Sequence, residues 1–151
     1  MKVIGVLALQ GAFLEHASHL EKCLATKNYE VEITIEIVKT PEDLAKCDAL
    51  IIPGGESTSM SLIAQRTGLY PYLYEFVHNS NKVVWGTCAG LIFLSAQLEN
   101  DNALVKTLGV LKVDVRRMHS EGKLNLLRKS ATSPNSYLVA IIFVRLLFEH
   151  P

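Results

Sequence analysis

Apolar runs and amphipathic stretches alternate along the first 117 residues of the chain. Residues 3–10 form a continuous apolar run, which is typical of a strand buried on both faces. Residues 31–37 alternate between apolar and polar, which predicts a half-exposed strand at a sheet edge. Between them, apolar side chains recur at helical spacing, at Phe13, Ala17, Leu20 and Leu24.

The alternation continues to about residue 115. Thr40, followed by Pro41 and two acidic residues, predicts the start of a short helix. A strand–helix order of this kind implies right-handed crossovers. We therefore expect a three-layer α/β fold, with a mostly parallel sheet and helices on both faces. The further expected strands are 49–52, 83–85 and 108–115, and the further helices are 58–67, 71–77 and one starting at Leu91.

Composition narrows the function classes. The 151 residues are 49% hydrophobic, enough for the core of one domain. Fifteen basic and fifteen acidic residues give no net charge, which argues against a nucleic-acid binder with a broad positive surface. The densest apolar run, residues 137–148, is shorter than the roughly 20 residues of a membrane-spanning helix. Three cysteines and no recognisable signal peptide predict reduced thiols and a cytoplasmic location.

The turn GTCAG, between an expected strand and an expected helix, is the first candidate for chemistry. A G-x-nucleophile-x-G turn holds its central residue in a strained conformation and needs small neighbours. The alternative is a buried structural cysteine, the better interpretation for an arbitrary cysteine. Here Gly86 and Gly90 at the outer positions, with the small Thr87 and Ala89, favour Cys88 as a nucleophile.

The second candidate is the turn PGGEST after the expected strand 49–52. Its two glycines let the backbone approach a ligand and present an N–H group to developing negative charge. The alternative is an ordinary strand-to-helix turn with Ser57 or Thr58 as the N-cap. Because carboxyl ends of parallel strands lie at one sheet edge, the turn faces Cys88, and we interpret it as an oxyanion hole.

Other polar residues carry weaker signals. Gln10 ends the first strand at the same edge and can reach the cleft, although a simple helix entry is the alternative. His16 and His19 stand at i, i+3, but no cysteine or acidic cluster completes a metal site, so we expect no metal. Cys23 and Cys47 are expected to be structural.

Three segments, LALQGAFLEH, IIPGGESTSM and VVWGTCAGLIFL, resemble the PdxT/SNO family, the glutaminase subunits of pyridoxal 5′-phosphate synthase. The resemblance covers residues 1–117 and implies the flavodoxin-like fold of class I glutamine amidotransferases. It implies that Cys88 attacks the side-chain amide of L-glutamine and releases ammonia. The ammonia would pass to a (β/α)₈-barrel synthase subunit that builds the vitamin B6 ring, and no cofactor is implied for this chain.

The same resemblance implies the residues of the glutamine site. Those implied to bind glutamine are Gly54, Gly55, Glu56, Ser57 and Arg117. The implied oxyanion donors are the backbone N–H groups of Gly55 and Ala89, with Gln10 completing the site when the partner docks.

After Arg117 the chain departs from the family pattern, which continues Asn-x-Phe-Gly-Arg-Gln and ends with a catalytic His-x-Glu pair. The final FEHP lacks that spacing, so His150 and Glu149 receive no catalytic role. The segment MHSEGKL, suitably encoded and read one nucleotide out of frame, becomes Asn-Ala-Phe-Gly-Arg-Gln-Ala. We therefore expect a truncated glutaminase domain over 1–117 and a poorly ordered, out-of-frame tail over 118–151.

Three classes of function follow. The first is a glutaminase that feeds a synthase, and the second is a catalytically dead partner-binding or pseudogene product. The third is another elbow-cysteine hydrolase, of the DJ-1/PfpI type, against which the PGGES turn argues. Without the family's histidine and glutamate, we expect the chain as written to be inactive.

Overall fold

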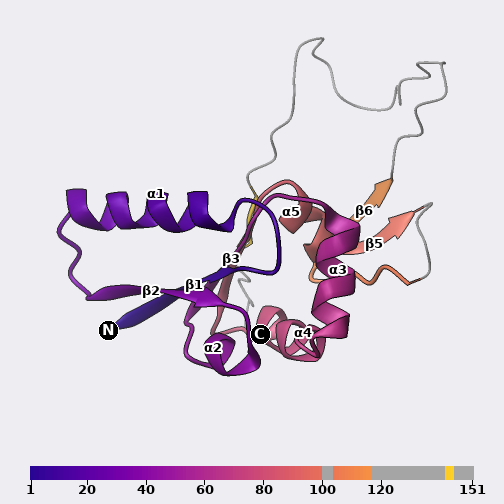
Figure 1. Ribbon diagram of the computed structural model, residues 1–151, viewed down its shortest axis with the longest axis horizontal. Coiled ribbons are helices and arrows are strands. Elements are labelled where there is room, and N and C mark those ends of the chain that lie inside the picture. The colour runs from indigo at the N-terminus through magenta and orange to yellow at the C-terminus, as the bar shows by residue number, and fades with distance from the viewer. Residues whose placement is uncertain (100–103, 117–141, 145–151) are drawn as a thin grey trace, which may run out of the picture.

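The computed structural model describes residues 1–99, 104–116 and 142–144, and Figure 1 shows their arrangement. Strands and helices alternate from the N-terminus to α5, as the hydrophobic pattern predicts. The strands are β1 (Lys2–Leu7), β2 (Ile33–Val38), β3 (Ala49–Ile52), β4 (Val83–Gly86), β5 (Ser95–Glu99), β6 (Leu111–Arg116) and β7 (Ile142–Val144). The helices are α1 (Phe13–Thr26), α2 (Pro41–Ala45), α3 (Ser57–Arg66), α4 (Tyr70–His78) and α5 (Ala89–Leu94).

The main sheet has the strand order β2-β1-β3-β4-β7. Strands β1 to β4 are parallel, which confirms the mostly parallel sheet, and β2 lies at its edge as predicted. Strand β7 pairs antiparallel with β4, with Phe143 opposite Trp85. It is the one part of the tail 118–151 that the structure describes, so the predicted boundary at residue 117 and the order of the remaining tail stay predictions.

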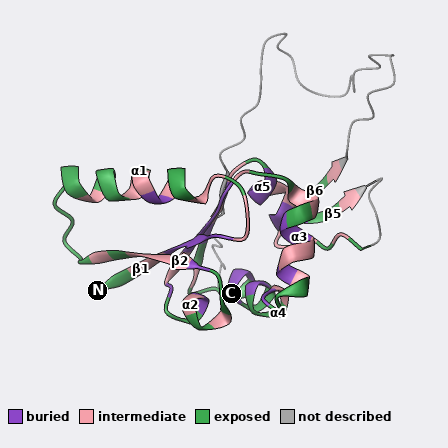
Figure 2. Ribbon diagram, in the orientation of Figure 1, coloured by how far each residue is buried: buried purple, intermediate pink, exposed green. Residues whose placement is uncertain are grey.

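Helices cover both faces of this sheet, as predicted. Helix α1 lies on one face, and α2, α3 and α4 lie on the other, where α5 packs against α3 and β4 (Figure 1). Figure 2 shows that buried residues concentrate on the α2–α5 side, where the hydrophobic core forms. Of the predicted apolar stripe on α1, only Ala17 is buried. The largest buried side chains on the core side include Leu50, Ile52, Met60, Leu73, Phe93 and Leu94.

The structure corrects the expected elements between residues 91 and 116. The helix expected from Leu91 begins at Ala89 and ends at Leu94, and β5 follows it unpredicted. The strand expected over 108–115 is β6, and it pairs with β5 in a separate two-stranded sheet rather than joining the main sheet. The buried Ser61 hydroxyl explains part of this path, because it binds both the carbonyl and the N–H of Lys106, at 2.7 and 2.8 Å.

Local sequence signals set the ends of the helices and strands around the candidate site. Helix α2 begins after Thr40, as predicted, and the Thr40 side chain and the Asp43 carboxylate form a capping box there. The apolar run 3–10 leaves the sheet at Leu7, earlier than expected, and Gly11 turns the chain into α1 with φ +80°. None of the helices in the described ranges is long and apolar enough to cross a membrane.

Candidate active site

Cys88 occupies a sharp turn between β4 and α5. Its φ of 49° and ψ of −110° make it the one non-glycine residue with positive φ in the described part of the chain. A Cβ at Gly90 would collide with the carbonyl oxygen of Ile52, and a Cβ at Gly86 would lie 2.8 Å from the Gly90 backbone. The turn therefore needs glycine on both sides of an exposed, strained cysteine, the geometry that the GTCAG motif predicts.

The PGGES turn lies directly against this cysteine. A Cβ built on Gly54 would lie 3.4 Å from the Cβ of Cys88, and the Thr87 N–H donates to the Ile52 carbonyl at 3.1 Å. Ala89 is the first residue of α5, so its N–H has no acceptor within the helix. The two turns thus meet at the carboxyl ends of β3 and β4, the edge at which the sequence predicts the site.

The start of α1 is fastened to the same turn. The Ala12 N–H donates to the Gly54 carbonyl at 3.0 Å. The Gln10 side chain donates from Nε2 to the Glu56 carbonyl at 3.1 Å and accepts at Oε1 from the Glu56 N–H at 3.2 Å. A Cβ on Gly55 would overlap the Gln10 amide, so this close approach requires glycine. Gln10 therefore holds the turn, and its implied part in the oxyanion site stays a prediction.

Glu56 is the N-cap of α3. Its carboxylate accepts hydrogen bonds from the backbone N–H groups of Thr58 at 3.0 Å and Ser59 at 2.6 Å. Burial acts to raise its pKa, but hydrogen bonds from Ser59 and Thr58 outweigh that effect and bring the pKa to about 2. The alternative that made Ser57 or Thr58 the N-cap is wrong, because α3 begins at Ser57 with Glu56 before it.

His16 reaches the cysteine turn from α1, a contact that its sequence pattern does not predict. Its Nε2 lies 3.2 Å from the Thr87 hydroxyl oxygen, and its ring packs edge-on against Trp85 with centroids 5.6 Å apart. Burial lowers the pKa of His16, and the nearby His19 lowers it further, while Glu15 opposes the shift. A signal was present in the sequence, since His16 follows the Gln10 turn by less than two helical turns.

His19 and the remaining cysteines lie away from the turn. His19 instead binds the carbonyl of Glu15 through Nδ1, at 2.6 Å. Among the described residues, no three His, Cys, Asp or Glu side chains gather as a metal site. Cys47 is buried, as expected of a structural cysteine, and burial raises its pKa to about 11. Cys23 is exposed on α1, and the expectation that it is a structural rather than a reactive cysteine stays a prediction.

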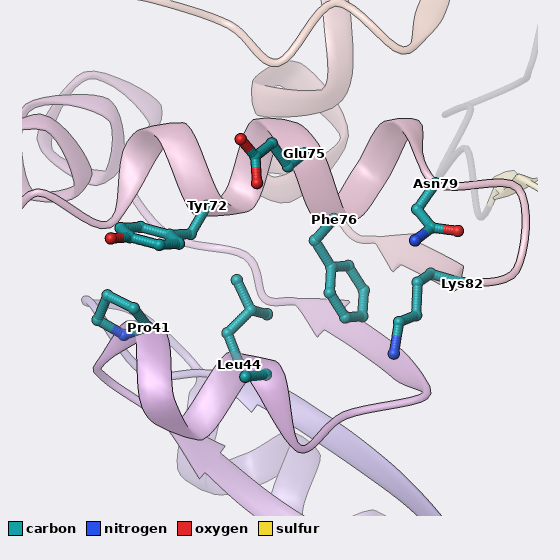
Figure 3. A pocket seen from close by; sticks show the side chains of 8 residues that line it. Pro41, Leu44, Tyr72, Glu75, Phe76, Asn79 and Lys82 are labelled. Atoms are coloured by element: carbon teal, nitrogen blue, oxygen red, sulfur yellow. The ribbon is translucent and has the colours of Figure 1, made fainter.

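A pocket of about 220 Å³ lies between α2 and α4, remote from the predicted site residues. Figure 3 shows the Leu44 and Phe76 side chains facing each other across it, with Tyr72 near Pro41. None of its lining residues belongs to the two turns, so it is not the predicted glutamine site. Arg117, the remaining predicted ligand of glutamine, lies outside the described residues, as do His119, Glu149 and His150.

Comparisons with known proteins point to one family. Residues 6–130 match the SNO glutamine amidotransferase family, a match that runs past Arg117. The pyridoxal 5′-phosphate synthase subunit SNO1 of Saccharomyces cerevisiae is 84% identical over 117 residues, which are 78% of this chain and 52% of that protein. The subunit PdxT of Tropheryma whipplei is 39% identical over 94% of this chain and 70% of its own length.

A solved structure supports the fold. A crystal structure of a glutamine amidotransferase superposes with a TM-score of 0.62 and 35% identity, over 76% of this chain and 56% of that one. The chain spans about half the length of the yeast relatives that it matches. The extent of the family match, together with the shared fold, shows that the chain belongs to the SNO glutamine amidotransferase family.

Proposed function

We propose that Cys88 is the nucleophile of a glutaminase that releases ammonia from L-glutamine. The observation that carries this proposal is the strained backbone of Cys88 at the end of β4, with Gly54 in van der Waals range. A cysteine is held at positive φ only where surrounding contacts enforce it, and such strain is concentrated at functional sites. The relatives named as pyridoxal 5′-phosphate synthase subunits support the choice of reaction.

The reaction follows from the groups in place. The Cys88 sulfur attacks the side-chain amide carbon of glutamine and forms a tetrahedral intermediate with a negative oxygen. The N–H groups of Gly55 and Ala89 stabilise that oxygen. The proton that the thiol gives up passes to the amide nitrogen. The C–N bond then breaks, and ammonia leaves a glutamyl thioester on sulfur. Water then attacks the thioester, releases glutamate and restores the thiol.

The partner and the location extend the proposal. We propose that the ammonia passes to the (β/α)₈-barrel subunit of pyridoxal 5′-phosphate synthase, and relatives named as subunits of that synthase support this choice. The exposed edge formed by Gly55, Glu56 and Cys88 is open to such a partner. Three free cysteines suit a reducing compartment, so we assign the chain to the cytoplasm. The glutaminase segment is 1–117.

A second candidate is a partner-binding relative without turnover. It is favoured by the sequence after Arg117, which departs from the pattern in which the family provides its catalytic histidine and glutamate. A thiol without a base is deprotonated only to a few per cent at neutral pH. Both candidates require that the chain bind the barrel subunit, and only the first requires ammonia release.

Ammonia release by the full chain tests the choice between them. We would mix the 151-residue chain with the barrel subunit and L-glutamine, and follow ammonia and glutamate, with Cys88→Ala as the blank. Sedimentation velocity of the same mixture reports complex formation. Ammonia release that Cys88→Ala abolishes supports the glutaminase, whereas complex formation without release supports the second candidate. Release that survives Cys88→Ala would contradict the proposed nucleophile.

A further inference from the structure

We infer that His16 is a positioning residue for the nucleophile, which it holds through the hydroxyl group of Thr87. The inference deepens the proposed function and rests on it for the reaction that Cys88 performs. His16 lies on α1, 71 residues before Thr87, so the contact joins two distant parts of the chain at the residue that directly precedes the nucleophile.

The main chain of Thr87 is already fixed on two sides. Its N–H donates to the Ile52 carbonyl of β3 at 3.1 Å, and its carbonyl accepts from the Gly90 N–H of α5 at 2.9 Å. The contact from His16 Nε2 to the Thr87 hydroxyl, at 3.2 Å, adds a third attachment from α1. Three elements therefore hold the residue from which the strained conformation of Cys88 departs.

The ring of His16 also packs against Trp85 of β4, which directly precedes the GTCAG turn. It stands at 86° to the Trp85 ring, with centroids 5.6 Å apart. His16 thus contacts Trp85, three positions before Cys88, through ring packing. It contacts Thr87, directly before Cys88, through a hydrogen bond. Because α1 buries no residue except Ala17, its position depends on such specific contacts more than on a deep core.

The same helix is tied to the other half of the site. The Ala12 N–H binds the Gly54 carbonyl at 3.0 Å, and the Gly54 backbone lies against Cys88. Helix α1 therefore links the PGGES turn at its first residues to the cysteine turn at His16. A shift of α1 would change the distance between the nucleophile and the oxyanion donors. The rate of the chemical step depends on this distance more strongly than the affinity for glutamine does.

Two matched pairs of variants separate the hydrogen bond from packing. His16→Phe keeps a ring against Trp85 and removes the hydrogen bond, whereas His16→Gln keeps a polar group at the position of Nε2. Thr87→Val removes the hydroxyl at nearly constant shape, and Thr87→Ser retains it. His19→Phe is the control, because His19 is exposed on the same helix and binds only the nearby Glu15 carbonyl.

The experiment measures alkylation of Cys88 in the full chain by a diazo-ketone analogue of glutamine, followed by intact mass. Its saturation curve separates the maximal labelling rate from the half-saturating concentration, and thermal unfolding is recorded for every variant. We expect His16→Phe and Thr87→Val each to lower the maximal rate about fivefold, the factor for one lost hydrogen bond, with half-saturation unchanged. His16→Gln, Thr87→Ser and His19→Phe should label like the unmodified chain, and the double variant should be no slower than either single variant.

Other results overturn the inference. It fails if His16→Phe labels at the unmodified rate, or if His16→Gln is as slow as His16→Phe, because packing alone would then explain the residue. Iodoacetamide, which needs no glutamine site, distinguishes failure of the proposed function. If glutamine does not protect Cys88 but the iodoacetamide rates still follow the order of the variants, His16 positions the thiol and the glutaminase proposal fails.

Discussion

The side-chain amide of Gln10 and the main chain of Glu56 are joined by two hydrogen bonds, at 3.1 and 3.2 Å, across 46 residues of sequence. The amide binds as the backbone of a neighbouring β-strand would, because it donates to the carbonyl and accepts from the N–H of the same residue. The pair fastens the turn after β1 to the turn after β3. The second of these turns contacts Cys88, so the pair sets one wall of the candidate site.

Loss of this pair should loosen the PGGES turn. We expect Gln10→Ala to lower the free energy of unfolding by about 1–2 kcal/mol, the value for two partly exposed hydrogen bonds. The concentration of glutamine analogue that half-saturates labelling of Cys88 should rise. Gln10→Glu is the matched control, since a carboxylate can accept from the Glu56 N–H but cannot donate to the Glu56 carbonyl. Equal urea denaturation curves for all three proteins would contradict the assignment.

The Glu56 carboxylate should make stability depend on pH. Its folded pKa of about 2 lies below the ordinary value of 4.5, so its stabilising effect is complete above pH 4.5 and is lost as the pH falls toward 2. Replacement of an N-cap costs about 1 kcal/mol, which we expect for Glu56→Ala at pH 7. The difference between the two proteins should shrink through this acidic window. Asp43 has a pKa of about 2 as well, but it is present in both proteins, so the difference between them reports Glu56 alone.

Urea titrations from pH 7 to the acid limit of folding provide the measurement. Glu56→Asn is the control, because asparagine caps a helix without titrating, and its difference from Glu56→Ala should stay constant with pH. A constant difference between the unmodified chain and Glu56→Ala over the same range would show that the carboxylate is not an N-cap.

Two glycines beside the nucleophile should respond differently to alanine. A Cβ at Gly90 would collide with the Ile52 carbonyl, so Gly90→Ala should cost about 1–3 kcal/mol or prevent folding. A Cβ at Gly54 would make an ordinary contact with Cys88 at 3.4 Å, so Gly54→Ala should fold normally but slow the glutamine analogue. Normal labelling by Gly54→Ala would place the substrate elsewhere.

The strain at Cys88 predicts a gain in stability when the nucleophile is lost. Strain of this kind costs about 1–3 kcal/mol, and glycine adopts positive φ without it. After the entropic cost of glycine, about 0.5–1 kcal/mol, Cys88→Gly should be more stable by about 1 kcal/mol. Cys88→Ala retains a Cβ and should keep the stability of the unmodified chain. A Cys88→Gly variant less stable than Cys88→Ala in urea would contradict the strained conformation.

Much of the site could be predicted where the signal is local. The GTCAG turn, the boundaries of β3 and the start of α2 after Thr40 each depend on neighbouring residues, and the structure confirms them. The misses depend on long-range contacts. Strand β5 forms only because β6 returns to pair with it, and the contacts of Gln10 and His16 cross 46 and 71 residues. The Glu56 cap was missed because glutamate is not among the preferred N-cap residues.

If the second candidate is correct, the sequence after Arg117 makes turnover by the chain as written negligible. We then expect slow alkylation of Cys88 but no steady ammonia release, because the final FEHP lacks the spacing of the family's His-x-Glu pair, which provides the base for the thiol proton and the acid for the leaving nitrogen. Restoring the reading frame after Arg117, so that Asn-Ala-Phe-Gly-Arg-Gln and the His-x-Glu pair return, should restore turnover with the barrel subunit. If the 151-residue chain is equally fast, a base lies elsewhere, and His119→Gln is the first variant to assay.

The most direct test of the central claim is the site at which a glutamine analogue reacts. Cys23 and Cys88 are both exposed, so Cys23 is a control within the same molecule. We would treat the full chain with the diazo-ketone analogue and identify the modified cysteine by peptide mass spectrometry, with and without L-glutamine. The account predicts one adduct, on Cys88, that L-glutamine suppresses and D-glutamine does not. Equal adducts on Cys23 and Cys88, unaffected by L-glutamine, would contradict it.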